Sequence, residues 1–154
     1  MTSGMAAQTA LIVEDGDEYL DALARLPGGP HWVQAKSAAT ALEVIARAPI
    51  AVAVLDMRFD RVPRAALAGD HAALTLEFGG DAERAWRHLA LHQGLYVLAA
   101  LRAAGWSGPV VIAYDFSREP RRFAALAARS APLHWIGDDA TAARWLEVLA
   151  AAVA

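Results

Sequence analysis

Short apolar runs recur along the chain, and most are followed by a segment whose apolar positions have helical spacing. An apolar run bounded by turn residues is typical of a buried parallel strand. The strands predicted in this way are residues 9–13, 31–35, 50–55, 110–113 and 133–136. Alternating strands and helices predict an α/β fold, a doubly wound five-stranded parallel sheet of flavodoxin-like order 2-1-3-4-5. A single domain is expected over residues 9–154, after a loose N-terminal tail at residues 1–8.

The segments between the strands predict helices that begin at small polar or acidic residues. Ser37 and Ser117 are placed to cap two of them, and Asp138 or Asp139 is placed to cap the last. The expected helices are residues 17–26, 37–48, 117–129 and 138–153. This pattern is that of a compact sheet covered on both faces.

The segment at residues 59–93 departs from this alternation of strands and helices, because a turn between a strand and a helix normally needs only a few residues. Residues 59–80 show few apolar periods and are expected to form a mobile loop over the tips of the strands. Residues 81–104 have helical spacing and predict one long helix, bent near Gly94. The region is therefore interpreted as an insertion or an extended loop and helix.

Two of the predicted strands end in carboxylates, at Glu14 and Asp15 and again at Asp56. Ligand sites of open α/β sheets lie outside the carboxyl ends of the strands. The three side chains are therefore expected to share one acidic pocket. Carboxylates repel one another unless a cation lies among them, and hard oxygen ligands favour Mg²⁺.

Composition narrows the range of functions. The chain has 154 residues, a formal net charge of -3 and no cysteine. The charge argues against a general nucleic-acid binder, and the lack of cysteine excludes disulfides and thiol chemistry. No run approaches the roughly 20 apolar residues of a membrane span. A cytoplasmic protein without a membrane or nucleic-acid partner is expected.

Four segments resemble the receiver domain of bacterial response regulators. Leu11-Ile-Val-Glu-Asp15 resembles the first strand and acidic pair of that family, and Val54-Leu-Asp-Met-Arg58 resembles its third strand and phosphoacceptor. Residues 94–102 and 108–112 are similar to its third helix and fourth strand. The resemblance covers most of the chain outside residues 59–93, and it implies two-component signalling by phosphorelay.

The resemblance also implies a chemistry for the acidic pocket. Glu14 and Asp15 would bind Mg²⁺, Asp56 would accept a phosphoryl group, and the backbone carbonyl of Arg58 would complete the metal shell. A carboxylate would attack phosphorus while the metal ion neutralises charge on the transferring oxygens. The partner would be a histidine kinase or a downstream effector.

Two departures from the family pattern predict an atypical receiver. The family ends its fourth strand with Thr or Ser, where this chain has Ala113 or Tyr114. The family ends its fifth strand with Lys, where this chain has Ile136-Gly137-Asp138 and no lysine. The only lysine, Lys36, lies elsewhere in the sequence. Phosphorylation of Asp56 would thus lack the two groups that sense the phosphoryl oxygens.

Candidate interaction residues lie near helix ends. Arg118, Arg121 and Arg122 flank a predicted helix start, where cations are unfavourable by roughly 0.3–1 kcal/mol each. Pairing with an anion, in the acidic pocket or on a partner, would offset that cost. Trp86 and Trp145 are interface candidates, because aromatic side chains dominate binding hot spots.

His88 and His92 share one helix face, but the helix lacks the glutamate of a His-Glu-x-x-His zinc motif, so a surface pair is expected. We therefore expect an atypical receiver-like signalling module, not an enzyme, that acts by protein–protein contact and is able to form a homodimer. One alternative is a small Mg²⁺-dependent phosphoryl-transfer enzyme with Asp56 as nucleophile. Another is a metal-free dimerisation scaffold.

Overall fold

A computed structural model describes residues 3–154 and contains a five-stranded parallel sheet of order β2-β1-β3-β4-β5. The predicted α/β fold and strand order are therefore confirmed. The strands are β1 (Thr9–Val13), β2 (His31–Ala35), β3 (Val52–Asp56), β4 (Val110–Ala113) and β5 (Leu133–Ile136). Among the described residues, no helix is both long enough and apolar enough to cross a membrane.

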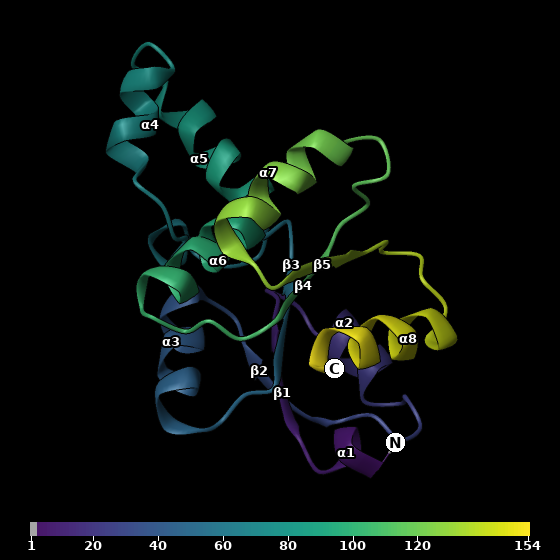
Figure 1. The fold of residues 1–154 in the computed structure, drawn as a ribbon. Helices are drawn as coiled ribbons and strands as arrows, with labels where there is room; N and C mark the ends of the chain where they lie inside the picture. The colour runs from purple at the N-terminus through teal and green to yellow at the C-terminus, as the bar shows by residue number, and fades with distance from the viewer. Residues whose placement is uncertain (1–2) are drawn as a thin grey trace.

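Helices cover both faces of the sheet (Figure 1). The short α2 (Glu18–Leu23) and the C-terminal α8 (Ala142–Val153) cover one face, and α3 (Ala38–Arg47), α6 (Gln93–Ala103) and α7 (Pro120–Ser130) cover the other. Successive strand side chains point to opposite faces, so each strand contributes to two cores. In β3, for example, Val52 and Val54 pack on the side of α8, whereas Ala53 and Leu55 pack on the side of α6. Burial on both sides explains why the strands are almost uniformly apolar.

The helix ends differ in part from the sequence-based expectation. Ser37 caps α3 as predicted and accepts a hydrogen bond from the Thr40 N–H at 3.1 Å. Ser117 does not cap α7, which begins two residues after Arg118 with Glu119 at its N-cap. Thr141, rather than Asp138 or Asp139, caps α8, because its hydroxyl accepts from the Arg144 N–H.

The expected N-terminal tail also contains structure, namely the short helix α1 (Ser3–Ala6). Met5 of this helix packs against the core beside α8. Residues 1–2 of the expected tail lie outside the described part of the chain.

The segment at residues 59–80, expected to be a loop, contains a 3₁₀ turn (Arg64–Ala66) and the helix α4 (His71–Glu77). This helix lies against α5 (Ala82–Leu91), and the two form a hairpin that projects from the sheet (Figure 1). The expectation of little structure was wrong for residues 71–77, because Asp70 caps α4 through its side chain and α4 packs on α5.

The predicted long helix is divided at His92 into α5 and α6, close to the bend expected at Gly94. The Gln93 amide is fully buried and bonds to Ala68 N at 2.6 Å, Ala68 O at 3.1 Å and Leu89 O at 3.0 Å. A Cβ on Gly94 would lie 2.5 Å from the Asp56 carbonyl oxygen. Only glycine therefore lets the start of α6 approach the end of β3 this closely.

Candidate functional site

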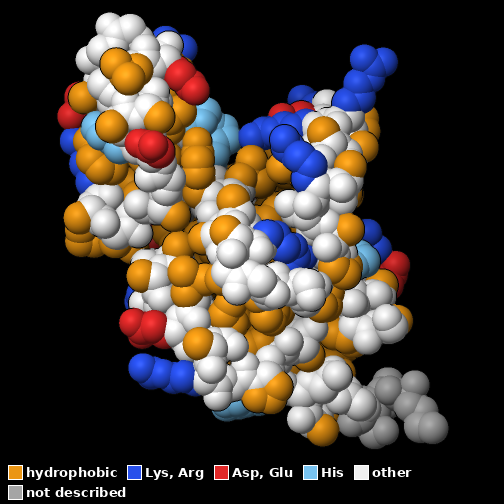
Figure 2. Space-filling model, turned by 60° about the vertical axis from the view of Figure 1, so that its left-hand side comes forward, with side chains coloured by type: hydrophobic (Ala, Val, Ile, Leu, Met, Phe, Trp, Pro, Cys, Tyr) orange, Lys and Arg blue, Asp and Glu red, His pale blue; other side chains and the backbone are white. Residues whose placement is uncertain are grey.

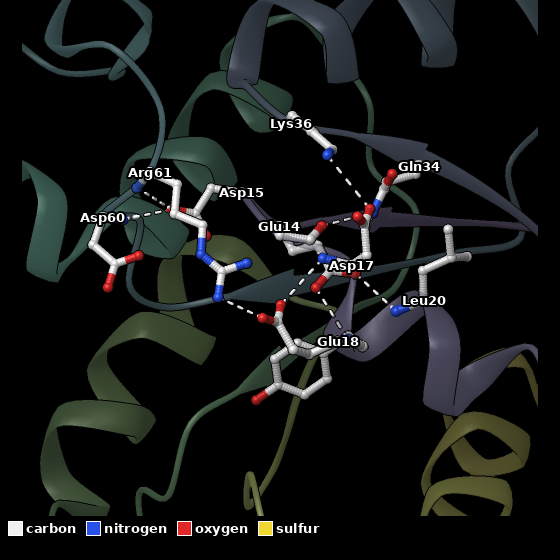
Figure 3. Close-up of polar contacts among 11 residues, drawn as sticks. Glu14, Asp15, Asp17, Glu18, Leu20, Gln34, Lys36, Asp60 and Arg61 are labelled. Carbon is white, nitrogen blue, oxygen red and sulfur yellow. Dashed lines mark hydrogen bonds and ion pairs between the residues drawn. The ribbon is translucent and has the colours of Figure 1, made fainter.

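Glu14 follows β1 and lies buried at the start of α2. Its carboxylate accepts hydrogen bonds from the backbone N–H of Tyr19 at 3.0 Å and of Leu20 at 2.8 Å, and from the Gln34 amide at 3.4 Å (Figure 3). Burial raises the pKa of Glu14, and these hydrogen bonds oppose that shift. Both oxygens of Glu14 thus bond to protein groups, and the residue fixes the first turn of α2 to the tip of β1.

Asp15, the next residue, is bonded to the insertion. One oxygen, Oδ2, accepts from the backbone N–H of Asp60 at 2.5 Å and of Arg61 at 2.6 Å (Figure 3). The Arg61 side chain then crosses Gly16 and forms an ion pair with Glu18. The chain just after β3 therefore lies over the tip of β1. The sequence predicted this position for all of residues 59–80, and for α4 the prediction was wrong, because α4 projects from the sheet.

Asp56 ends β3, beside β1, at the centre of the sheet. Burial, with the nearby charge of Asp15 as the next cause, raises the pKa of Asp56 to about 7. The backbone amides of Met57 and Arg58 lower it, but not enough to offset those effects. The sequence-based prediction that the three carboxylates share one region is thus supported by their electrostatic coupling.

Tyr19 also belongs to this region. Burial raises its pKa, with the charge of Asp56 as the next cause, so its phenol lies within electrostatic range of that carboxylate. The ring packs edge-on against Trp145 with a centroid distance of 6.0 Å. Tyr19 thereby links the acidic region to the core between α2 and α8.

The ends of β4 and β5 present no side chain that binds phosphate. Ala113 pairs with Asp56 in the sheet register, and Ile136 pairs with Ala113. Both side chains are buried in the core. Lys36 does lie at the same edge of the sheet, after β2, but it forms an ion pair with Asp17 at 3.4 Å.

These contacts bear on the expected Mg²⁺ ligands. Glu14 does not fit that role, because its oxygens already accept three hydrogen bonds. Oδ1 of Asp15, the Asp56 carboxylate and the Arg58 carbonyl are the remaining oxygen donors of the expected set. Within residues 3–154 no group of three or more His, Asp or Glu side chains is arranged to hold a metal ion. A cation at this edge would therefore depend on Asp15, Asp56 and the Arg58 carbonyl alone.

The expected arginine candidates do not reach the acidic region. Arg122 forms an ion pair with Glu119 at 2.9 Å, and Glu119 also accepts a hydrogen bond from the Tyr114 hydroxyl at 2.5 Å. Arg118 and Arg121 are exposed beside them. They remain surface candidates, whereas Arg61, whose backbone N–H bonds to Asp15, lies at the acidic edge.

The two tryptophan candidates have different environments. Trp145 is 6% exposed and is a core residue, so it offers no substantial interface. Trp86 lies half-buried in α5 and stacks on His71 of α4 with a centroid distance of 3.7 Å. Its indole therefore holds the projecting hairpin together.

Sequence reasoning missed two residues that organise the acidic region, Arg61 and Gln34. Arg61 lies five positions after Asp56, in the segment expected to cover the strand tips, and this position was the available signal. Gln34 is a polar residue in an otherwise apolar strand, and its amide donates to Gly16 O at 2.8 Å and to Asp17 Oδ1 at 3.1 Å. Such an isolated polar position near a strand end is a recognisable sign of a buried contact.

No protein-family model and no curated protein sequence matches this chain. Among solved structures, the chain is similar to the receiver domain of the Francisella response regulator 1452, with a TM-score of 0.63, 13% identity and coverage of 96% of this chain and 97% of that one. It is also similar to the signal receiver domain of an HD domain-containing protein from Pseudomonas fluorescens Pf-5 (TM-score 0.61, 13% identity, 96% and 88% covered). The N-terminal domain of an uncharacterized protein from Wolinella succinogenes has a TM-score of 0.57 and 18% identity, with 94% and 93% covered. The chain therefore has the receiver fold, and the predicted fold is confirmed.

Proposed function

We propose that this protein is an atypical receiver-like signalling module that acts through protein–protein contact in the cytoplasm. One observation carries the proposal: backbone amides bond to both oxygens of Glu14 and to one oxygen of Asp15, two of the carboxylates that a receiver would use for its metal ion. Glu14 is bonded to α2, and Asp15 is bonded to Asp60 and Arg61. These bonds make the acidic pair a structural clamp between β1, α2 and the insertion.

The environment of Asp56 supports the same conclusion. A phosphoryl group on this residue would add negative charge beside Asp15. The neighbouring strand ends are Ala113 and Ile136, which have no group to bond its oxygens. Arg61, which lies at the acidic edge, already pairs with Glu18. Phosphorylation of Asp56 would therefore have little means of moving β4 or β5.

Mg²⁺ is an optional component of this function. Asp15, Asp56 and the Arg58 carbonyl would hold it, and it would neutralise their charge. A metal-free dimerisation scaffold is the second candidate, because the amide bonds to Glu14 and Asp15 stabilise the pair without a metal ion. Binding of Mg²⁺ to the folded protein distinguishes the two.

The partner would be a histidine kinase or a downstream effector, bound in a manner that depends little on the state of Asp56. The test uses ¹H–¹⁵N NMR spectra of the protein with Mg²⁺ and beryllofluoride, which mimics a phosphoryl group. We expect shifts confined to the tips of β1 and β3, with Asp56→Asn as the control that removes them. A large shift at Tyr114 or Trp135 in the wild type would contradict the proposal, because it would reveal a working switch.

A further inference from the structure

A cleft of about 450 Å³ lies between α7 on one side and α6 with the end of α5 on the other. In Figure 2 it is a notch with histidine side chains on one wall and arginine side chains on the other. Its lining includes His88 of α5, His92 between α5 and α6, and Arg122 and Arg129 of α7. The two histidines belong to the segment at residues 59–93, which distinguishes this chain from the receiver pattern.

The charges facing the cleft are mainly positive. Burial lowers the pKa of His88, and the nearby groups of His92, Arg122 and Arg84 lower it further. The acidic groups that face it are Glu77 of α4 and Glu119 before α7.

Glu119 is already bonded to Tyr114 and Arg122. Arg129, in contrast, forms no ion pair within residues 3–154. The cleft thus contains one arginine, Arg129, that has no internal ion-pair partner among the described residues.

The floor of the cleft is apolar and includes Leu95, Leu98 and Leu126. An apolar trough between helices, open on one side and with charged edges, is the form of site that receives an amphipathic helix. Enclosed pockets that bury most of their ligand are typical of small molecules instead. The cationic edges favour a partner with negative charge beside its apolar stripe.

We propose that this cleft docks an acidic amphipathic helix of a partner protein. The proposal deepens the proposed function, on which it rests, because it gives the place of the contact and the chemistry of the partner. Leucine-like side chains of the partner lie on Leu95 and Leu126, and its carboxylates pair with Arg129 and accept hydrogen bonds from the rings of His88 and His92.

The probe is a synthetic helical peptide of about 18 residues with Leu at i, i+3, i+4 and i+7 and Glu beside them. Its affinity for the full chain is measured by fluorescence anisotropy, and its site by NMR shifts of the wild type. The control peptide has Gln for every Glu. The test variant is Arg122→Glu/Arg129→Glu, and the matched variant Arg25→Glu/Arg47→Glu changes the net charge equally at exposed positions of other surfaces.

We expect the acidic peptide to shift the resonances of Ala99 and Ser130 and to bind roughly tenfold more weakly to the Arg122/Arg129 variant only. Equal affinity for both variants, or equal affinity of the Gln peptide, would overturn the proposal. Shifts at the cleft with inorganic phosphate but not with the peptide would assign it to a small anion instead. The NMR map needs no variant, so misfolding of a variant leaves the proposal testable. Failure here leaves the beryllofluoride experiment unaffected, so the two proposals are tested separately.

Discussion

Asp56→Asn is expected to stabilise the folded protein at neutral and alkaline pH. The carboxyl of Asp56 has a pKa of about 7 in the folded protein against an ordinary value of 3.8, because it is buried beside Asp15. Between these values the folded protein holds a proton that the unfolded chain has lost. The free energy of unfolding therefore rises as the pH falls from about 8 towards about 4. Above about pH 7 the ionised Asp56 destabilises the folded protein by the full amount.

The magnitude follows from the interval between the two pKa values. From 3.8 to about 7, at ~1.4 kcal/mol per pH unit, the formal penalty is roughly 4 kcal/mol. Solvent reaches part of this side chain and screens its charge, so about 2 kcal/mol is the expected effect. Asparagine has nearly the same shape and removes the charge without leaving a cavity.

The assay is urea unfolding of the wild type and of Asp56→Asn between about pH 5 and about pH 8. The variant should be more stable than the wild type at pH 8, and the difference should shrink steadily towards pH 5. The pKa of Glu14 is also raised and has the same sign, but it contributes to both proteins. Asp115→Asn is the control, because its hydrogen bonds to Ser117 lower the pKa of that exposed carboxyl and no stabilisation is expected. If Asp56→Asn is not more stable at pH 8, the electrostatic reasoning is refuted.

Three further predictions follow from individual contacts. Isothermal titration should detect weak Mg²⁺ binding that Asp15→Asn abolishes and Glu14→Gln leaves nearly unchanged, because Glu14 is bonded to α2; equal loss in both variants would contradict this. Gly94→Ala should destabilise the protein by about 1–3 kcal/mol in urea unfolding, since its Cβ would meet the Asp56 carbonyl; an unchanged midpoint would show that α6 has room to move. Gln93→Leu should cost about 2–3 kcal/mol by leaving Ala68 N and O unpaired, and an unchanged thermal midpoint would argue against this buried network.

The strands were the most predictable part of the fold. β1, β2, β4 and β5 begin and end at the predicted residues, because a strand buried on both faces must be apolar throughout and ends where polarity returns. The cap of α3 was predictable for a similar reason, since Ser37 bonds within its own turn. The ends of α7 and α8 were not, because several nearby polar residues could serve as caps and packing chose among them.

The candidate site was predictable in its location but not in its contacts. Glu14, Asp15 and Asp56 had to meet at one edge of the sheet, because parallel strands end there. Nothing in their sequence indicates that Asp15 accepts from Asp60 and Arg61, which lie more than forty positions later. Long-range hydrogen bonds depend on the path of the intervening chain.

The sequence by itself determined the sheet, its strand order and the acidic edge, because burial and chain direction act through local composition. Only the tertiary structure decided what the insertion does. Helical periodicity in residues 81–104 predicts a helix, but the break at His92 arises from the approach of Gly94 to β3 and from the bonds of Gln93 to Ala68. The same break lets α5 leave the sheet and face α7 across the cleft, and no local pattern encodes that spacing.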